Sequence, residues 1–190
     1  MGVDIHGWIE VKAPIDEWRG VVKLDGIGPN QRYDLFGCLF GVMNLVNFRP
    51  IAPERGLPAD LSHEATGELV RWSEEWGQEP CWPTWITGSE IVAVDWDEES
   101  EKADSRIHEY KRREDGELVF ERKSVSRQDS PAARLKEGEI LEVGDIVYKA
   151  EKIRRKDTVS GNWQLLFKLM ATLSDHYGQE SVRMVVWFDY

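Results

Sequence analysis

An alternation of apolar and polar side chains at the start of the chain constrains the fold most. In GVDIHGWIEV, residues 2–11, apolar side chains lie on alternate positions: Val3, Ile5, Ile9 and Val11. The positions between them hold Asp4, His6, Trp8 and Glu10. Because successive side chains of a strand point to opposite faces, this pattern predicts a strand over 2–12 with one face in a core. The other face is either solvated or half of a binding site.

A second strand pattern closes the sequence, in VRMVVWFDY, residues 182–190. One face of this predicted strand holds Val182, Met184, Val186 and Phe188. The opposite face holds Arg183, Val185, Trp187 and Asp189. We expect the two terminal strands to lie in the same sheet, where they can pair.

Helical patterns occupy much of the sequence between these strands. The segment PNQRYDLFGCLFGVMN, residues 29–44, has the apolar spacing of a packed helix. A second helix is expected to run to about Trp76, with Asp60 or Ser62 as its N-cap.

Two further helices are expected in the second half of the chain. Thr87 and Glu90 have the spacing of a capping box, which predicts a short helix directly after Thr87. The last helix has Ser160 or Asn162 as its expected N-cap and Gly178 as its stop.

The middle of the chain is its most polar part. Residues 106–125 are expected to form an exposed hairpin about an Asp-Gly turn, with a charged helix as the alternative, and 139–154 a second hairpin about a Gly-Asp turn. We therefore predict an α+β fold, a single domain over 1–190. Its mixed or antiparallel sheet includes both terminal strands and is packed by three or four helices, and 95–160 form a polar peripheral insertion.

The charge of the chain bears on its partners. The formal net charge is −11 over 190 residues, which disfavours broad nucleic-acid binding because phosphates are repelled. The two basic clusters, 111–113 and 154–156, lie among acidic residues and are predicted to be solvated surface.

Compartment signals in the sequence are few. With only Cys38 and Cys81, a disulfide framework is not expected, and Cys38 fits a buried helical position. Neither a signal peptide nor a membrane span is expected, since no basic region precedes an apolar stretch and no long apolar run occurs. The prediction is a cytoplasmic protein, with homo-oligomerisation left open.

The Asp4-x-His6 pair is a candidate metal site. On a strand, these two side chains share a face and can hold one ion, or Asp4 can orient His6. With Glu10 and Asp189 they would form an oxygen-rich site, which suits magnesium or manganese better than structural zinc. The alternative is a hydrogen-bonded structural pair without a metal.

Arginines in structured loops form a second candidate site. Arg32 precedes a predicted helix, and Arg49 and Arg55 flank a proline-rich loop. Guanidinium groups match carboxylate and phosphate geometry, and aromatic side chains such as Tyr33 and Trp85 can stack against a ring. This combination is typical of a pocket for a nucleotide-like ligand. In the alternative interpretation, each arginine pairs with a nearby carboxylate and fixes a loop.

Several sequence blocks resemble one family. They are MGVDIHGWIE, RYDLFGCLFGVMN, PIAPERGLPADLS, TWITGSE and VRMVVWFD. Together and in this order they resemble a family of small, uncharacterised bacteriophage and prophage proteins, with 95–160 outside the likeness. The resemblance implies that the following residues belong to the family pattern: Asp4, His6, Arg32, Tyr33, Asn44, Arg55, Asp60, Thr87, Glu90, Arg183 and Asp189.

The chain also departs from that family. Relatives carry Val-Arg-Asn where this chain has Val42-Met43-Asn44, and histidines where it has Cys81-Trp82-Pro83. If those histidines were ligands or catalysts, this chain lacks them, which weakens an enzymatic interpretation. The resemblance favours one polar cleft where the first strand, the Arg-Gly-Leu-Pro loop and the last strand converge.

These observations support three hypotheses. The first is a phage-type accessory protein that binds a small anionic or nucleotide-like ligand, one such role being sequestration of a host immune-signalling nucleotide. Its candidate ligand-binding residues are Asp4, His6, Arg32, Tyr33, Asn44, Arg49, Arg55, Trp85, Arg183 and Asp189. The second is a metal-dependent phosphoester hydrolase that uses Asp4, His6, Glu10 and Asp189 with a divalent metal. The third is an acidic protein that inhibits a host factor.

Overall fold

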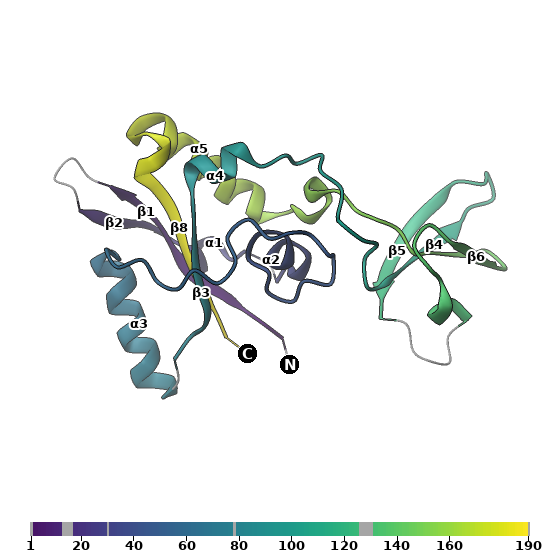
Figure 1. Ribbon diagram of the computed structural model, residues 1–190, viewed down its shortest axis with the longest axis horizontal. Helices are drawn as coiled ribbons and strands as arrows, with labels where there is room; N and C mark the ends of the chain where they lie inside the picture. The colour runs from purple at the N-terminus through teal and green to yellow at the C-terminus, as the bar shows by residue number, and fades with distance from the viewer. Residues whose placement is uncertain (1, 13–16, 30, 78, 126–130, 190) are drawn as a thin grey trace.

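The two strands expected at the ends of the sequence lie side by side. The computed structural model describes residues 2–12, 17–29, 31–77, 79–125 and 131–189. Within them, β1 (Ile5–Lys12) pairs antiparallel with β8 (Val182–Phe188), which confirms that both terminal strands belong to one sheet. That sheet has the order β2-β1-β8-β3, with β2 (Trp18–Lys23) and β3 (Cys81–Thr87) at its edges (Figure 1).

The register of β1 and β8 decides which side chains share a face. Ile5, Ile9 and Val11 lie opposite Phe188, Met184 and Val182, and all six are buried. This apolar face packs against two helices, α2 (Tyr33–Phe40) and α5 (Asn162–Tyr177), as the ring contacts of Phe36 with Phe188 and Trp163 show. The alternation at the start of the chain therefore predicts the core face correctly.

The polar face of the same sheet is covered by α3 (His63–Trp76). Trp8 donates through Nε1 to Glu68, and the Gly20 N–H donates to Glu64, at 2.8 and 2.9 Å. Because α3 lies over this face, β8 is buried on both sides. Ser62 caps α3 by accepting from the Ala65 N–H, so of the two expected caps it is Ser62 that serves.

Of the remaining helices, the sequence predicted α2, α4 and α5 but not α1, and it assigned one cap wrongly. α1 (Leu24–Ile27) follows β2, and α2 is shorter than the predicted segment 29–44, of which Asn30 lies outside the described residues. α4 (Gly88–Ala93) begins with the predicted Thr87–Glu90 capping box. Neither Ser160 nor Asn162 caps α5; Gly161 holds the N-cap position, and Asn162 instead donates to the carbonyls of Ile27 and Gly28.

A second antiparallel sheet lies at the other end of the molecule (Figure 1). Its strands are β4 (Ile107–Arg112), β5 (Leu118–Ser124), β6 (Ile140–Val143) and β7 (Ile146–Lys149), in the order β5-β4-β7-β6. Both predicted hairpins are thereby confirmed, and the alternative of a charged helix is wrong. The short 3-10 helix η1 (Pro131–Arg134) precedes β6, and residues 126–130 of the predicted insertion lie outside the described residues. The fold class is α+β, as predicted.

Two chain segments connect the sheets and pair with each other. The Ser100 N–H donates to the Ile153 carbonyl at 2.9 Å, and the Asp104 N–H donates to the Glu151 carbonyl at 3.0 Å. The Ser105 N–H donates to the Leu45 carbonyl at 2.7 Å, which adds the loop after α2 to the connection. The second sheet is therefore anchored through backbone hydrogen bonds to the first half of the chain.

Arg155 is buried at this connection, in the 3-10 helix η2 (Arg155–Thr158). Its guanidinium donates to the Glu98 carboxylate at 2.8 Å and to the carbonyls of Cys38 and Arg49 at 3.1 and 2.9 Å. The prediction that 154–156 is solvated surface is wrong for Arg155, because carbonyls from α2 and from the loop after it replace water around its guanidinium. Cys38 is buried, as predicted.

None of the helices in the described part of the chain is both long enough and apolar enough to cross a membrane.

Candidate functional site

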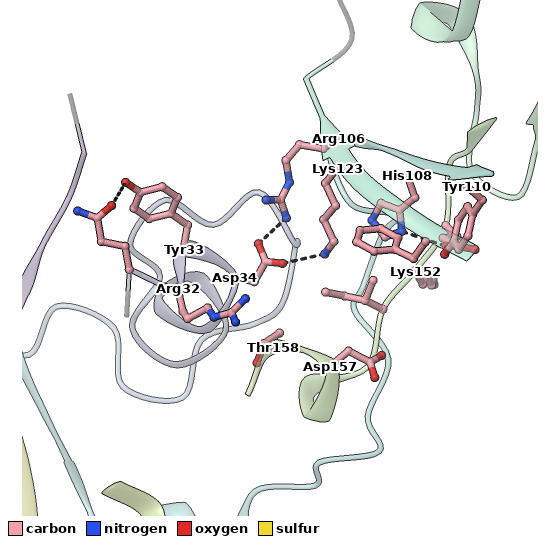
Figure 2. Close-up of a pocket in the computed structure, with 14 residues that line it drawn as sticks. Arg32, Tyr33, Asp34, Arg106, His108, Tyr110, Lys123, Lys152, Asp157 and Thr158 are labelled. Carbon is pink, nitrogen blue, oxygen red and sulfur yellow. Dashed lines mark hydrogen bonds and ion pairs between the residues drawn. The ribbon is translucent and has the colours of Figure 1, made fainter. Parts of the chain in front are cut away.

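A pocket of about 660 Å³ lies between the start of α2 and the second sheet (Figure 2). Its lining comprises Gln31, Arg32, Tyr33, Asp34, Arg106, His108, Tyr110, Phe120, Lys123, Glu151, Lys152, Ile153, Asp157 and Thr158. The volume falls within the range of about 300–1,000 Å³ that is typical of small-molecule sites. We call this space the junction pocket.

Strand geometry places one wall of the junction pocket. Arg106 directly precedes β4, and His108 and Tyr110 follow it on alternate positions, so these side chains share the face that looks toward α2. β5 adds Phe120 and Lys123 from the neighbouring strand. The opposite wall comes from the first residues of α2 and the two residues before it, Gln31 and Arg32.

Two carboxylates hold the basic side chains of this wall. Asp34 on α2 accepts from Arg106 at 2.5 Å and from Lys123 at 2.7 Å. Asp104 accepts from the same Arg106 at 2.7 and 2.9 Å and lies 2.9 Å from the Lys123 ammonium. Arg106 and Lys123 therefore bridge the second sheet to α2, and their charges are already balanced.

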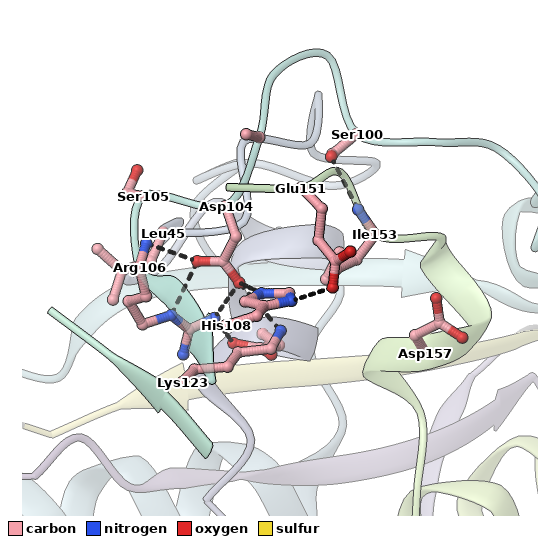
Figure 3. A network of polar contacts seen from close by, with 12 residues as sticks. Leu45, Ser100, Asp104, Ser105, Arg106, His108, Lys123, Glu151, Ile153 and Asp157 are labelled. Carbon is pink, nitrogen blue, oxygen red and sulfur yellow. Dashed lines mark hydrogen bonds and ion pairs between the residues drawn. The ribbon is translucent and has the colours of Figure 1, made fainter. Parts of the chain in front are cut away.

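Asp104 is the buried centre of this network (Figure 3). Its side chain has no exposed surface, and His108 Nε2 lies 3.2 Å from its Oδ2. Burial by itself raises the pKa of this carboxyl, but hydrogen bonds from His108 and Arg106 and the charge of Lys123 outweigh it. The pKa of Asp104 is therefore held well below its usual range, and the group is an anion in the folded protein.

His108 lies between two carboxylates. Its Nδ1 lies 2.9 Å from Glu151 Oε1, while its Nε2 faces Asp104. Each ring nitrogen of His108 therefore faces a carboxylate oxygen within hydrogen-bond distance. Tyr110 also donates to Glu151; burial, followed by the hydrogen bond to Glu151 and its charge, raises the pKa of the Tyr110 hydroxyl. This part of the pocket is a satisfied polar network rather than a free reactive group.

Arg32 differs from the other basic residues of the lining. Its side chain is exposed and has no hydrogen-bond or ion-pair partner among the described residues, whereas Lys152 lies 3.5 Å from Glu137. In Figure 2 its guanidinium lies below Asp34, on the side of the pocket that faces Thr158. Among the described residues, the junction pocket thus has one guanidinium without a partner, and its lining also includes the rings of Tyr33, Tyr110 and Phe120.

The structure also brings together several residues predicted at the first strand. The Asp4 N–H donates to Asp189 Oδ1 at 2.9 Å, and His6 lies 3.6 Å from Asp189 and 3.3 Å from Asp25. Gln31 donates to Asp4 and accepts from the Tyr33 hydroxyl, so Tyr33 is connected to the same group. Among the described residues, no group of three or more His, Cys, Asp or Glu side chains has an arrangement that could hold a metal ion.

Glu10 and Arg183 lie at the other end of the paired strands. Arg183 donates to Glu10 at 2.7 Å and to Asp60 at 2.7 Å, and its guanidinium lies 3.9 Å from the centre of the Trp18 ring. The six residue steps from Arg183 to Asp189 span roughly 20 Å on an extended strand. Glu10 is therefore separate from Asp4, His6 and Asp189, and the expected single polar cleft is divided into two clusters.

Arg55 fixes a loop, as the alternative interpretation of the arginines expected. It donates to both Glu90 carboxylate oxygens at 2.6 and 3.0 Å and to the carbonyls of Ile51 and Trp85. Its guanidinium also lies 5.2 Å from the centre of the Trp85 ring. These contacts connect the proline-rich loop to the capping box of α4 and leave Trp85 outside the junction pocket.

Asn44 and Arg49 lie in the loop after α2. Asn44 donates to the Phe48 carbonyl at 2.8 Å, and its Cα would lie 2.7 Å from a Cβ placed on Gly37. Its position is therefore determined by close packing against α2. The Arg49 side chain is exposed, and its carbonyl accepts from Arg155. Neither residue lines the junction pocket.

Sequence reasoning identified only Arg32 and Tyr33 of the pocket lining. It missed Arg106, His108, Tyr110, Lys123 and Glu151, because they lie in the segment interpreted as a peripheral insertion. The alternation Arg106-x-His108-x-Tyr110 on a predicted strand was the available signal.

Comparison of the chain with protein-family models, with curated proteins and with solved structures finds no match.

Proposed function

We propose that the protein binds a small anionic, nucleotide-like ligand in the junction pocket. The observation that carries the proposal is the unpaired Arg32 guanidinium, which lines a pocket of about 660 Å³ together with three aromatic rings. A guanidinium forms two parallel hydrogen bonds to a phosphate or carboxylate, and aromatic rings stack against a base.

Local charge supports an anionic ligand despite the acidity of the whole chain. Four basic side chains line the pocket, Arg32, Arg106, Lys123 and Lys152, against three acidic ones, Asp34, Glu151 and Asp157. Because Arg106 and Lys123 are engaged by Asp34 and Asp104, they contribute a fixed network and leave Arg32 to bind the ligand.

The biological side of the proposal is a phage-type accessory role in the cytoplasm, such as sequestering a host immune-signalling nucleotide. It rests on the sequence resemblance, together with the absence of a complete catalytic motif in the sequence. Sequestration requires binding without turnover, which separates this role from that of a phosphoester hydrolase.

The test is a calorimetric titration of the purified protein with AMP, ATP, cyclic dinucleotides and ADP-ribose, after a thermal-shift screen of the same compounds. One of them should bind at a 1:1 ratio and be recovered unchanged by chromatography. Arg32→Ala should weaken its binding about tenfold or more, since a hydrogen bond to a charged group contributes about 1.5–3 kcal/mol.

Arg71→Ala is the matched control, because Arg71 is exposed on α3, away from the junction pocket. It should bind the nucleotide as the parent does. If no compound binds, or if Arg32→Ala binds as tightly as the parent, the proposal fails, and inhibition of a protein partner becomes the leading hypothesis. Chelator-sensitive hydrolysis would favour the hydrolase.

A further inference from the structure

A second pocket, of about 310 Å³, lies beside the last turn of α3. Its lining comprises Trp72, Trp76, Glu79, Pro80, Cys81, Phe188 and Asp189. These residues come from the end of α3, the start of β3 and the end of β8, which Figure 1 shows near the chain termini. We call it the tryptophan pocket. It shares no lining residue with the junction pocket.

Aromatic surface dominates one side of the tryptophan pocket. Trp72 and Trp76 lie on successive turns of α3, with ring centres 6.0 Å apart and planes inclined by 39°. Trp76 is 60% exposed, although it is a large aromatic side chain. On the side of Trp72 that faces the sheet, the centre of the His6 ring lies 4.7 Å from the centre of the Trp72 ring, and this contact holds the Trp72 ring in place. The two rings form a preformed wall whose outer part is left to solvent.

Every charged side chain in the lining is acidic. Glu79 is exposed and has no hydrogen-bond or ion-pair partner among the described residues, and Asp189 accepts only one hydrogen bond there, from the Asp4 N–H. Asp4 and Asp25 lie close behind through their contacts with Asp189 and His6. The C-terminal end of α3, capped by Gly77, adds the negative end of a 14-residue helix dipole.

We propose that the tryptophan pocket binds an organic cation of the methylated or quaternary ammonium class. Aromatic faces attract cations, and the acidic side chains select positive charge. The rings offer no hydrogen-bond acceptors, so the N–H groups of a bare ammonium that face them would lose hydration without replacement, and only those that reach Glu79 or Asp189 would find an acceptor. A methylated ammonium has few or no N–H groups to satisfy and gains from burial of its methyl groups against tryptophan.

The experiment compares choline with 3,3-dimethyl-1-butanol, its uncharged isostere of the same shape. Binding is followed by NMR of the tryptophan indole N–H signals during titration into the purified protein. Choline should shift the Trp72 and Trp76 signals and bind at least tenfold more tightly than the isostere, since the electrostatic attraction to the rings and carboxylates is lost without the charge.

Two variants locate the site. Trp76→Leu should weaken choline binding about tenfold, and Glu79→Gln about threefold to fivefold. Both side chains are exposed, so the fold should persist, which thermal denaturation checks. Glu74→Gln, an exposed carboxylate on α3 outside the lining, is the matched control and should bind as the parent does.

Two further ligands show whether the cation belongs to a small molecule or to a modified protein. A free trimethyl-lysine amide that binds like choline indicates a small-molecule ligand, whereas a trimethyl-lysine peptide that binds much more tightly indicates a modified protein; either result supports the ammonium site. The proposal is overturned if choline does not bind at millimolar concentrations, if the isostere binds equally well, or if both Trp76→Leu and Glu79→Gln bind choline like the parent.

Discussion

The junction pocket and the tryptophan pocket differ in how many of their charged side chains already have a partner in the protein. In the junction pocket most charges are paired within the protein, and Arg32 is the cation that remains unpaired among the described residues. In the tryptophan pocket the carboxylates of Glu79 and Asp189 face an exposed aromatic wall with no basic residue in the lining. The comparison teaches that neither the net charge of −11 nor the number of charges in a lining predicts a ligand. Our ligand proposals depend instead on the charged side chains, Arg32 and Glu79, that have no partner among the described residues.

The largest effect on stability should come from breaking the network that pairs the charged side chains of the junction pocket. Asp104→Asn leaves Arg106, Lys123 and His108 without their shared buried anion, and loss of one partner of a buried ion pair costs about 3–5 kcal/mol. We expect the free energy of unfolding in urea to fall by that amount. Hydrogen exchange should accelerate in β4 and β5 more than in β1 and β8. Equal acceleration in both sheets would contradict the view that this network mainly anchors the second sheet.

Lowering the pH should weaken the same network and reduce the free energy of unfolding. Because folding lowers the pKa of Asp104, its stabilising contribution is complete above the usual value near 3.9 and is lost as the pH falls below it. The free energy of unfolding should decrease below about pH 4 by about 1.4 kcal/mol per pH unit from this group. The parent and Asp104→Asn should therefore converge in stability as the pH falls from 5 to about 3. Parallel pH profiles would show that another carboxylate is responsible.

A smaller effect is expected when one of the anions of the junction pocket is removed, which makes its charge differ more from that of the tryptophan pocket. Asp34→Asn removes one of the two anions that hold Arg106 and Lys123, and Asp104 still holds both, so the junction pocket becomes more cationic. We expect the nucleotide that binds the parent to bind Asp34→Asn about fivefold more tightly, as one nearby charge contributes about 1 kcal/mol in an open site. Asp175→Asn, an exposed change of equal charge on α5, is the control. Unchanged or weaker binding would argue against an anionic ligand.

The smallest effect concerns an arginine that belongs to neither pocket. Arg55 forms a partly exposed pair with Glu90, and Arg55→Ala should reduce stability by about 1 kcal/mol, which shows as a lower Tm in thermal denaturation. Glu90→Gln should give a similar loss, because it weakens the same pair and the capping box of α4. If both variants have the parent Tm, the pairing is not stabilising, and Arg55 becomes available as a candidate for ligand binding.

Local patterns allowed much of the fold to be predicted from the sequence. Period-two alternation identified β1 and β8, Thr87 and Glu90 identified the start of α4, and Asp-Gly and Gly-Asp turns identified both hairpins. β2 and β3 were not predicted; in β3, Pro83 lacks an N–H and is typical of a break in a strand, yet the chain forms a strand there, with Trp82 at a φ of +46°. Each successful prediction depended on residues close together in the sequence.

The candidate site was less accessible to such reasoning. Asp34 meets Arg106 and Lys123 across 72 and 89 residues, and no periodicity indicates that α2 will face β4 and β5. Arg155 was misjudged for the same reason, since its partners Cys38 and Arg49 are more than 100 residues away. The tryptophan pocket likewise joins a helix end to two strand ends.

The position of β8 has a consequence for how the protein folds during synthesis. β8 lies between β1 and β3, yet the ribosome makes it after every other described strand. The first sheet therefore lacks one of its two central strands until β8 has left the ribosome. The pairing of β1 with β8 joins residues that are far apart in the sequence, and such contacts form slowly. The hairpins of the second sheet need only local contacts. A nascent chain should thus complete its second sheet first, while β1 waits with one edge unpaired.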